Sequence, residues 1–229
     1  MKKLTKISHN ETMAALDKAL TTLARAKSFL EISGTSKDLV LTMLIKGASE
    51  YIERTYCRRT FGRTTYTNQV INGKDSKRLW LKNKPIIGDV TLQVRTTPNN
   101  EDAWQSIEAQ NFYINRDAGN LELLRHNDAW LGLGGTFKEG VQNYRVTYTA
   151  GYYLPKDSEF EDGTDDEYDL PADLELAVLD LVSAVYNVRQ SGGIKSQEVG
   201  DVSITYGNEL EKHPTIKKTL DKYRTVQYA

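Results

Sequence analysis

Residues 169–207 read DLPADLELAVLDLVSAVYNVRQSGGIKSQEVGDVSITYG, and the fold is organised around this stretch. Its first part places apolar residues at steps of three and four, so they share one face of a helix. This face consists of Leu174, Val178, Leu181 and Val185, with Ala177 and Val188 beside them. Pro171 fits the first turn, and Arg189 precedes a Ser-Gly-Gly stop. The sequence therefore predicts a core helix that ends near residue 190.

The second part, residues 191–207, has a different pattern. A glycine pair is followed by apolar residues that alternate with polar ones, which is typical of a strand. An extended segment can pair with the sheet of a neighbouring subunit through main-chain hydrogen bonds. We expect residues 198–206 to form such an arm. The expected contact residues are Gly192, Gly193, Val202, Ile204 and Tyr206.

The composition is that of an ordinary globular protein. The chain has 229 residues, of which 39% are hydrophobic and 27% charged. It is long enough for one domain, or for one domain with an insertion. No apolar run approaches the roughly 20 residues needed to cross a bilayer, and the basic start leads into a polar stretch. We therefore expect neither a membrane protein nor an exported one. The single cysteine, Cys57, fits a reducing compartment.

The charges are unevenly distributed along the chain. The formal net charge is −1, yet residues 157–169 contain eight acidic residues and no basic one. The remainder is mildly basic, which permits contact with nucleic acid but does not imply it. A solvated loop, contact with a basic neighbouring subunit and repulsion of nucleic acid are all compatible with the acidic run. An EF-hand is excluded because its ligand order is missing.

Helical patterns also occur near both ends of the chain. Apolar residues at helical spacing predict a first helix within residues 10–31 and a second from residue 35 or 36 to about residue 52. The short break between them suggests a helical hairpin. Pro214 begins a short last helix that carries Ile216, Leu220 and Tyr223.

Between these helical regions the sequence is rich in threonine, tyrosine and β-branched residues, which favour strands. The expected strands are 64–70, 78–81, 90–94, 112–114, 121–124 and 144–148. Asn-Gly, proline and glycine clusters separate them, as expected for turns. A mostly antiparallel meander is the simplest arrangement.

The fold class is therefore predicted to be α+β. A helical bundle forms from the two ends of the chain, with the β-sheet block inserted between them. The predicted boundaries are a helical hairpin at 1–62, a β block at 63–153 and a final region at 154–229. The final region holds the acidic linker, core helix, arm and last helix, and forms one domain with the hairpin.

The sequence predicts no catalytic, cofactor or metal site, and no enzymatic activity. His9, His126 and His213 are far apart and lack metal-ligand spacing. Cys57 lies beside two arginines but also near Tyr56, which favours a small buried apolar role. The glycine-rich residues 132–136 lack the lysine of a phosphate-binding loop.

Basic residues occur in two groups. Arg54, Arg58, Arg59 and Arg63 lie at the end of the second helix, and another group follows in the β block. The second group consists of Lys74, Lys77, Arg78, Lys82 and Lys84. Both groups fit a solvated face over a core. The alternative function is a nucleic-acid-binding module that uses a basic β face, with nearby aromatic residues stacking on bases.

Four motifs in order resemble a known family. Residues 48–61 read ASEYIERTYCRRTF, with an Ala-Ser, Ile-Glu and Arg-x-Phe pattern. Leu-Trp-Leu and Pro-Ile follow within 79–90, VTYTAGY at 146–152, and LPADL within 170–189. This order resembles the head-tail connector proteins of tailed bacteriophages, also called head completion or adaptor proteins.

The resemblance implies a structural role in the virion and no catalysis. It also implies a ring of about twelve identical subunits under the portal, which extends the DNA channel and docks the tail or a stopper protein. Genomic DNA would pass through the lumen without sequence-specific binding. The protein would be made in the host cytoplasm and function at the head-tail interface. We expect subunits to meet through the arm, and the acidic run to attract Arg54, Arg58 and Arg59 of a neighbour.

Overall fold

The computed structural model divides the chain into two compact units. The helical unit comprises residues 1–62 and 152–229, and the β unit comprises residues 63–151. For residues 199–205 only the backbone is described. The described ranges are 18–97, 103–124, 135–156, 168–190 and 199–225.

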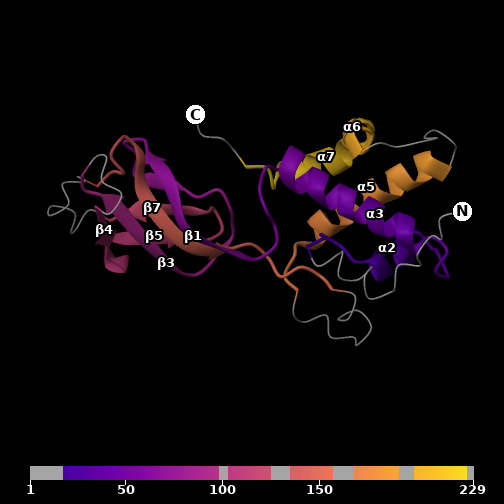
Figure 1. Ribbon diagram of the computed structural model, residues 1–229, viewed down its shortest axis with the longest axis horizontal. Coiled ribbons are helices and arrows are strands. Elements are labelled where there is room, and N and C mark those ends of the chain that lie inside the picture. The colour runs from indigo at the N-terminus through magenta and orange to yellow at the C-terminus, as the bar shows by residue number, and fades with distance from the viewer. Residues whose placement is uncertain (1–17, 98–102, 125–134, 157–167, 191–198, 226–229) are drawn as a thin grey trace, which may run out of the picture. The chain divides into compact units, whose positions relative to one another are not determined.

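The helical unit contains five α-helices within its described residues, and one of them continues into a π-helix. The α-helices are α2 (Leu23–Phe29), α3 (Asp38–Glu50), α5 (Ala172–Gln190), α6 (Val199–Lys212) and α7 (Pro214–Asp221). The π-helix η1 (Tyr51–Tyr56) directly extends α3. Helix α5 packs against α3, α6 and α7, and Figure 1 shows α3 and α5 side by side.

Helix α5 buries the face that its spacing indicates. Leu174, Val178 and Leu181 are fully buried, and Val185 is 1% exposed. Asp173 and Glu175 occupy the first turn and Arg189 the last, which suits the helix dipole at both ends. The apolar face of α5 is thus covered by other helices and is not exposed to solvent.

The core of the helical unit draws on both ends of the chain. Leu20, Leu41 and Leu220 belong to one buried cluster with the α5 face. The Thr225 amide donates to the Cys57 carbonyl at 3.0 Å, which fixes the segment after α7 against the end of η1. Both ends are therefore needed to complete this core.

The β unit contains seven strands within its described residues, all paired antiparallel. They form a four-stranded sheet in the order β1-β7-β3-β4 and a three-stranded sheet in the order β2-β6-β5. The strands are β1 (Thr64–Gly73), β2 (Arg78–Trp80), β3 (Ile86–Arg95), β4 (Trp104–Ile107), β5 (Phe112–Asn115), β6 (Asn120–Leu123) and β7 (Gly140–Ala150). A short 3-10 helix η2 (Ala109–Asn111) precedes β5. The helices and antiparallel sheets together confirm the α+β class.

One buried cluster joins the two sheets of the β unit. Leu92 and Val146 of the larger sheet and Leu121 of the smaller sheet belong to it. Along β7, buried residues alternate with partly exposed ones from Tyr144 to Ala150, as expected for a strand with one face in the core. The opposite face of the larger sheet is therefore turned away from this core.

Two features of the predicted topology were wrong. The strands do not form a meander, because β7 lies between β1 and β3. Strand β4 was not predicted at all. In addition, the helix predicted within residues 10–31 is described only as α2, whose N-cap Thr22 accepts a hydrogen bond from the Arg25 amide. The part before residue 18 lies outside the described residues.

The predicted strand at 198–206 was also wrong, because residues 199–212 form helix α6. The alternation of Val202, Ile204 and Tyr206 covers only five residues. Over a longer window, Val199, Val202, Tyr206 and Leu210 lie three, four and four residues apart, which is helical spacing. Tyr206 and Leu210 are both buried, one turn apart, so burial of a helical face determines the structure here.

Candidate interaction surface

Residues 48–61, the first of the four motifs, form a structural junction at the end of α3. Ala48, Ile52 and Phe61 are fully buried. The Ser49 hydroxyl accepts a hydrogen bond from the Leu20 amide, and a Glu53 carboxylate oxygen accepts one from the Phe61 amide at 2.7 Å. These residues therefore hold the chain where it leaves the helix, rather than facing a partner.

Glu53 shows how this junction offsets the cost of burial. Burial raises the pKa of its carboxyl, while the amides of Phe61 and Gly62 and the charges of Arg54 and Arg59 act in the opposite direction. Hydrogen bonds to a carboxylate favour its charged form. The partly buried acid is thus held by backbone donors, as at a helix cap.

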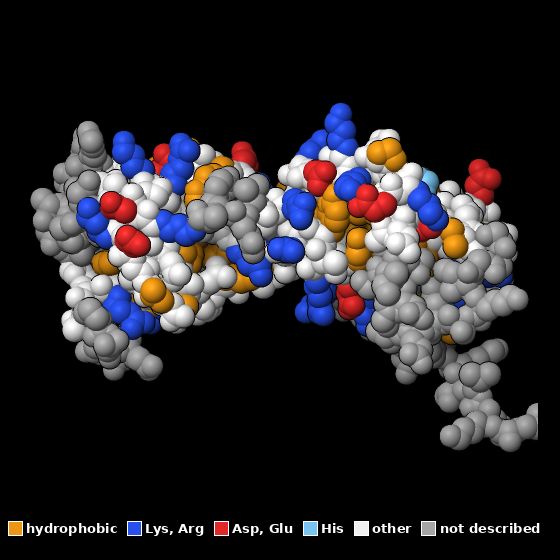
Figure 2. Space-filling model, turned by 90° about the horizontal axis from the view of Figure 1, so that it is seen from above, with side chains coloured by type: hydrophobic (Ala, Val, Ile, Leu, Met, Phe, Trp, Pro, Cys, Tyr) orange, Lys and Arg blue, Asp and Glu red, His pale blue; other side chains and the backbone are white. Residues whose placement is uncertain are grey.

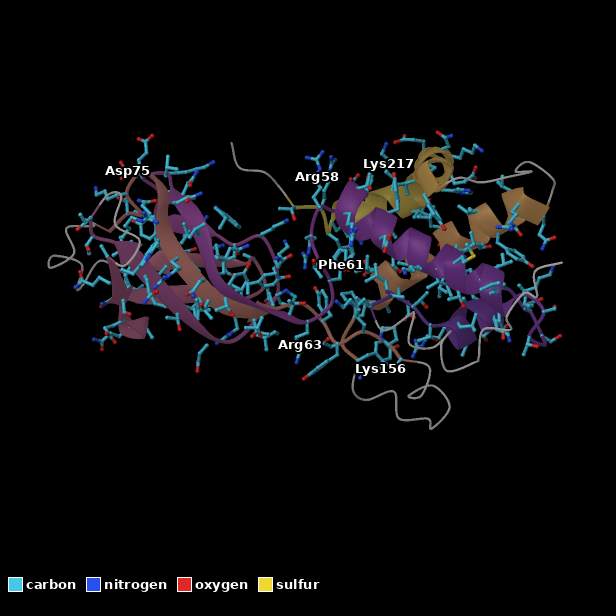
Figure 3. The ribbon with its side chains drawn as sticks, in the orientation of Figure 1. Arg58, Phe61, Arg63, Asp75, Lys156 and Lys217 are labelled. Carbon is cyan, nitrogen blue, oxygen red and sulfur yellow. The ribbon has the colours of Figure 1, made fainter. Side chains whose placement is uncertain are left out.

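Of the three arginines predicted at an interface, two are exposed and one is buried. Arg54 and Arg58 are exposed, whereas Arg59 is 4% exposed and its guanidinium lies over the Phe61 ring at 4.7 Å. Arg58 has a left-handed backbone with φ of 56°, and its side chain points away from the helices in Figure 3. Arg59 is thus part of the structural junction.

A third exposed arginine, Arg224, joins this surface from the other end of the chain. Its guanidinium lies over the Tyr56 ring, 5.5 Å from its centre, while the Tyr56 hydroxyl donates to Asp221 at 2.7 Å. Arg224 could not be predicted from the sequence, because nothing near it indicates that residues 224 and 56 meet. We call Arg54, Arg58 and Arg224 the arginine surface.

The arginine surface carries exposed positive charge. None of its three residues forms an ion pair with a carboxylate of the described residues. By contrast, Lys217 on α7 pairs with Glu211, and Lys222 directly after α7 pairs with Asp173. In Figure 2, basic side chains lie among acidic ones over the helical unit. This surface can therefore attract an anionic partner.

Tyr206 does not reach a neighbouring subunit, because it lies in the core of its own chain. It is fully buried, its hydroxyl donates to the Leu44 carbonyl at 2.8 Å, and its ring stacks on Tyr51. Burial raises the pKa of the hydroxyl. Gly192 and Gly193 lie outside the described residues. Val202 and Ile204 lie on α6, but their side chains are not described.

Cys57 is buried beside the last helix. Its side chain is fully buried, with Sγ 3.7 Å from the Leu220 carbonyl oxygen. Burial raises the pKa of the thiol to about 12, against the opposing charges of Arg59 and Arg224. At neutral pH the group is an apolar thiol and not a nucleophile.

Metal ligands do not gather among the residues that the structure describes. Within these ranges no three acidic, histidine or cysteine side chains cluster as metal ligands, and no helix is long and apolar enough to cross a bilayer. His213 is the N-cap residue of α7. His9, His126 and residues 132–134 of the glycine-rich loop lie outside the described part of the chain.

The basic group of the β unit is partly neutralised. Arg78 pairs with Glu122 at 2.7 Å across β2 and β6, so it is not a free cation. Both residues are on the smaller sheet. Because the group includes an ion-paired member, it is a weaker candidate for a nucleic-acid surface than the sequence suggests.

Hydrogen bonds between Tyr153 and Asp169 hold together the two ends of the segment that carries the acidic run. The Tyr153 amide donates to the Asp169 carboxylate, and the Asp169 amide donates to the Tyr153 carbonyl. Residues 157–167 between them lie outside the described part of the chain. The run is therefore attached to the helical unit immediately before α5.

The comparisons with known proteins identify the family. No curated protein compared with this chain matches it. The family model described as "Head completion protein" matches residues 19–226, which include nearly all of both units. This family is structural and not known for catalysis. The chain therefore belongs to the head completion proteins, the head-tail connectors of bacteriophages, and has a structural role in phage head assembly.

Proposed function

We propose that this protein is an adaptor that forms an oligomeric ring under the portal, extends the DNA channel and docks the tail or a stopper protein. The resemblance of the four motifs supports a ring of about twelve subunits in the virion. DNA would pass through its lumen. The function is one of assembly, carried by surfaces rather than by a catalytic site.

The observation that carries this proposal is that the helical unit has one basic region and one acidic region. The arginine surface has no carboxylate partner among the described residues, while the acidic run at 157–169 has eight acidic residues and no basic one. A ring requires heterologous contacts, in which one face of a subunit meets a different face of the next. The two oppositely charged regions meet this requirement.

Charge attraction of this kind chiefly sets orientation and association rate, and salt weakens it. Packing at the portal would then supply the rest of the binding free energy. We therefore expect the free subunit to assemble poorly alone and to form a ring when the portal is present.

The test is native mass spectrometry of the subunit with and without its portal. The variant Arg54→Glu/Arg58→Glu reverses two charges on the arginine surface and should lower ring occupancy at least tenfold. The matched control is Lys37→Glu/Lys46→Glu, which reverses two exposed lysines in the same unit. The control should assemble as the parent does.

Normal ring formation by the arginine variant would refute the assignment of this surface. A subunit that never binds the portal under any salt condition would refute the adaptor function itself. Circular dichroism of each variant separates loss of assembly from loss of folding.

A further inference from the structure

The outer face of the four-stranded sheet carries a second cationic cluster. On β3, Leu92 and Val94 point into the core, so Gln93 and Arg95 lie on the opposite face. Arg95 is directly opposite Trp104 of β4, and Gln93 is opposite Arg145 of β7. Three adjacent strands thus bring two arginines and a tryptophan together.

Both guanidinium groups engage the same indole ring. The Cζ atom of Arg95 lies 4.7 Å from the centre of the Trp104 ring, and that of Arg145 lies 4.6 Å from it. The Arg145 Nε–H donates to the Gln93 side-chain oxygen at 2.7 Å. Stacking on an aromatic ring restricts each guanidinium while leaving its charge unneutralised.

These two charges have no carboxylate partner among the described residues. Neither arginine forms an ion pair there, and Arg95 Nε is buried without a hydrogen-bond partner. The acidic residue that shares this face of β3 is Asp89, six residues from Arg95. At about 3.3 Å per residue, six residues correspond to about 20 Å along the strand. The cluster is therefore open to an anion.

The rest of the outer face carries hydroxyl groups. Its hydroxyl residues are Thr65, Thr91, Ser106, Thr147 and Thr149. Of its apolar residues, Val70 lies on the edge strand β1 directly opposite Arg145, and Ile87 lies near the start of β3. Protein interfaces usually have an apolar centre, whereas phosphate groups are bound by arginine together with Ser, Thr and Gln. A polar face with two arginines matches the second type.

We propose that this outer face binds the phosphate backbone of DNA, without reading its sequence. The Trp104 ring is already engaged by two guanidinium groups, so it is not a free platform for stacking a base. Arg95 and Arg145 supply the charge, and the neighbouring hydroxyls supply hydrogen-bond donors. This binding goes beyond the proposed ring function, because it is a property of the single subunit and does not require assembly.

The test is fluorescence anisotropy of a labelled 20-base-pair duplex, titrated with the full-length subunit at several salt concentrations. Each neutralised phosphate contributes about 0.9 to the slope of log K against log salt. The variant Arg95→Gln/Arg145→Gln should therefore bind more weakly and reduce this slope by about 1.8. The variant Arg95→Lys/Arg145→Lys keeps both charges and should retain most of the slope.

The matched control is Arg78→Gln/Lys82→Gln, which removes two charges from the same unit but not from this face. An equal loss in the control, or no binding by the parent protein at low salt, would overturn the proposal. Poly-glutamate that competes as well as DNA, with the same arginine dependence, would instead assign the face to an acidic protein segment. Ring assembly measured in parallel keeps this result separate from the adaptor function.

Discussion

The two units of this protein are built from the chain in opposite ways. The β unit is one continuous segment, residues 63–151, whereas the helical unit combines residues 1–62 with 152–229. The polar contacts of the helical unit accordingly join residues that are far apart in the sequence. Thr21 donates to Glu175, and Tyr56 donates to Asp221. The β unit is held instead by its strand ladders and by a core from nearby segments.

The difference also appears in how charge is used. In the helical unit, Arg25 and Glu175 form an ion pair whose side chains are only 16% and 7% exposed. In the β unit, the Arg78–Glu122 pair has side chains 55% and 31% exposed. Buried pairs are costly to break, while exposed pairs contribute little. Stability of the helical unit should therefore depend on single polar contacts between chain ends.

The largest expected effect is at Tyr206, the fully buried residue that joins α6 to α3. Tyr206→Ala leaves a cavity and removes the hydrogen bond to Leu44, so the helical unit should lose about 3–5 kcal/mol of unfolding free energy. Hydrogen exchange followed by mass spectrometry should show faster exchange in the helical peptides while the β unit keeps its protection.

The control is Tyr113→Ala in β5, where the tyrosine is 59% exposed, and its effect should be within about 0.5 kcal/mol. Equal loss of protection in both units after Tyr206→Ala would show that they unfold together. The expectation that Tyr206→Ala weakens the helical unit alone would then be wrong.

A smaller effect is expected when the tie between chain ends is broken. Glu175→Gln removes the charge that faces Arg25 and weakens the contact with Thr21, and should cost about 2–3 kcal/mol. Glu122→Gln removes the exposed pair of the β unit and should cost less than about 1 kcal/mol. Chemical unfolding of both variants measures the difference, and equal costs would contradict the comparison.

The sequence predicted most strands of the β unit because their alternating pattern coincides with a one-sided core. Tyr144, Val146 and Tyr148 alternate with Arg145 and Thr147, and this pattern matches the observed burial. Strand β4 has the sequence WQSI, too short and too polar to show an alternation. Its pairing with β3 is therefore set by tertiary contacts, which a local pattern does not contain.

Alternation was misleading in the helical unit. The pattern from Val202 to Tyr206 is compatible with a strand, but Leu210 one turn beyond Tyr206 completes a helical face. For the proposed interaction surface, one local cluster in the sequence indicates Arg54 and Arg58, which the structure shows to be exposed. Arg224 could not be predicted, because its place beside Tyr56 results from the packing of the chain end against η1.

Replacing two glycines by alanine should change the free energy of unfolding in opposite directions. At Gly73, at the end of β1, an added Cβ would lie 1.8 Å from the Lys138 carbonyl oxygen, so Gly73→Ala should destabilise the β unit by about 1–3 kcal/mol. At Gly207, inside α6, the nearest atom is the Tyr51 hydroxyl oxygen at 3.4 Å. Gly207→Ala should stabilise the helical unit by about 0.5–1 kcal/mol, because alanine favours helices.

Thermal unfolding of the two glycine variants gives both signs in one experiment. A Gly73→Ala protein as stable as the parent would mean that the paired strands β1 and β7 relax around the new methyl group. A destabilised Gly207→Ala protein would mean that Tyr51 is held too rigidly to move.

The smallest effect is the loss of stability that the buried thiol causes at alkaline pH. The pKa of Cys57 is raised by burial from 9.0 to about 12, while those of Tyr144 and Tyr148 are raised from 10.0 to about 12. Below pH 9 the thiol is protonated in both folded and unfolded chains, so its contribution is fully present. Above pH 9 the unfolded chain releases the proton and the folded chain keeps it, so stability falls as pH rises toward 12.

The Cys57 thiol alone should therefore cost the helical unit about 1 kcal/mol between pH 9 and 10. Tyrosines of both units, whose pKa values burial raises from 10.0, add to the loss as the pH approaches 10. Urea unfolding at the two pH values, followed separately in each unit by hydrogen exchange, measures this loss. Cys57→Ala lacks the thiol and should show a flatter dependence in the helical unit alone. If the alanine variant kept the full slope, the alkaline sensitivity would have to come from other groups, and the buried thiol would be only a packing residue.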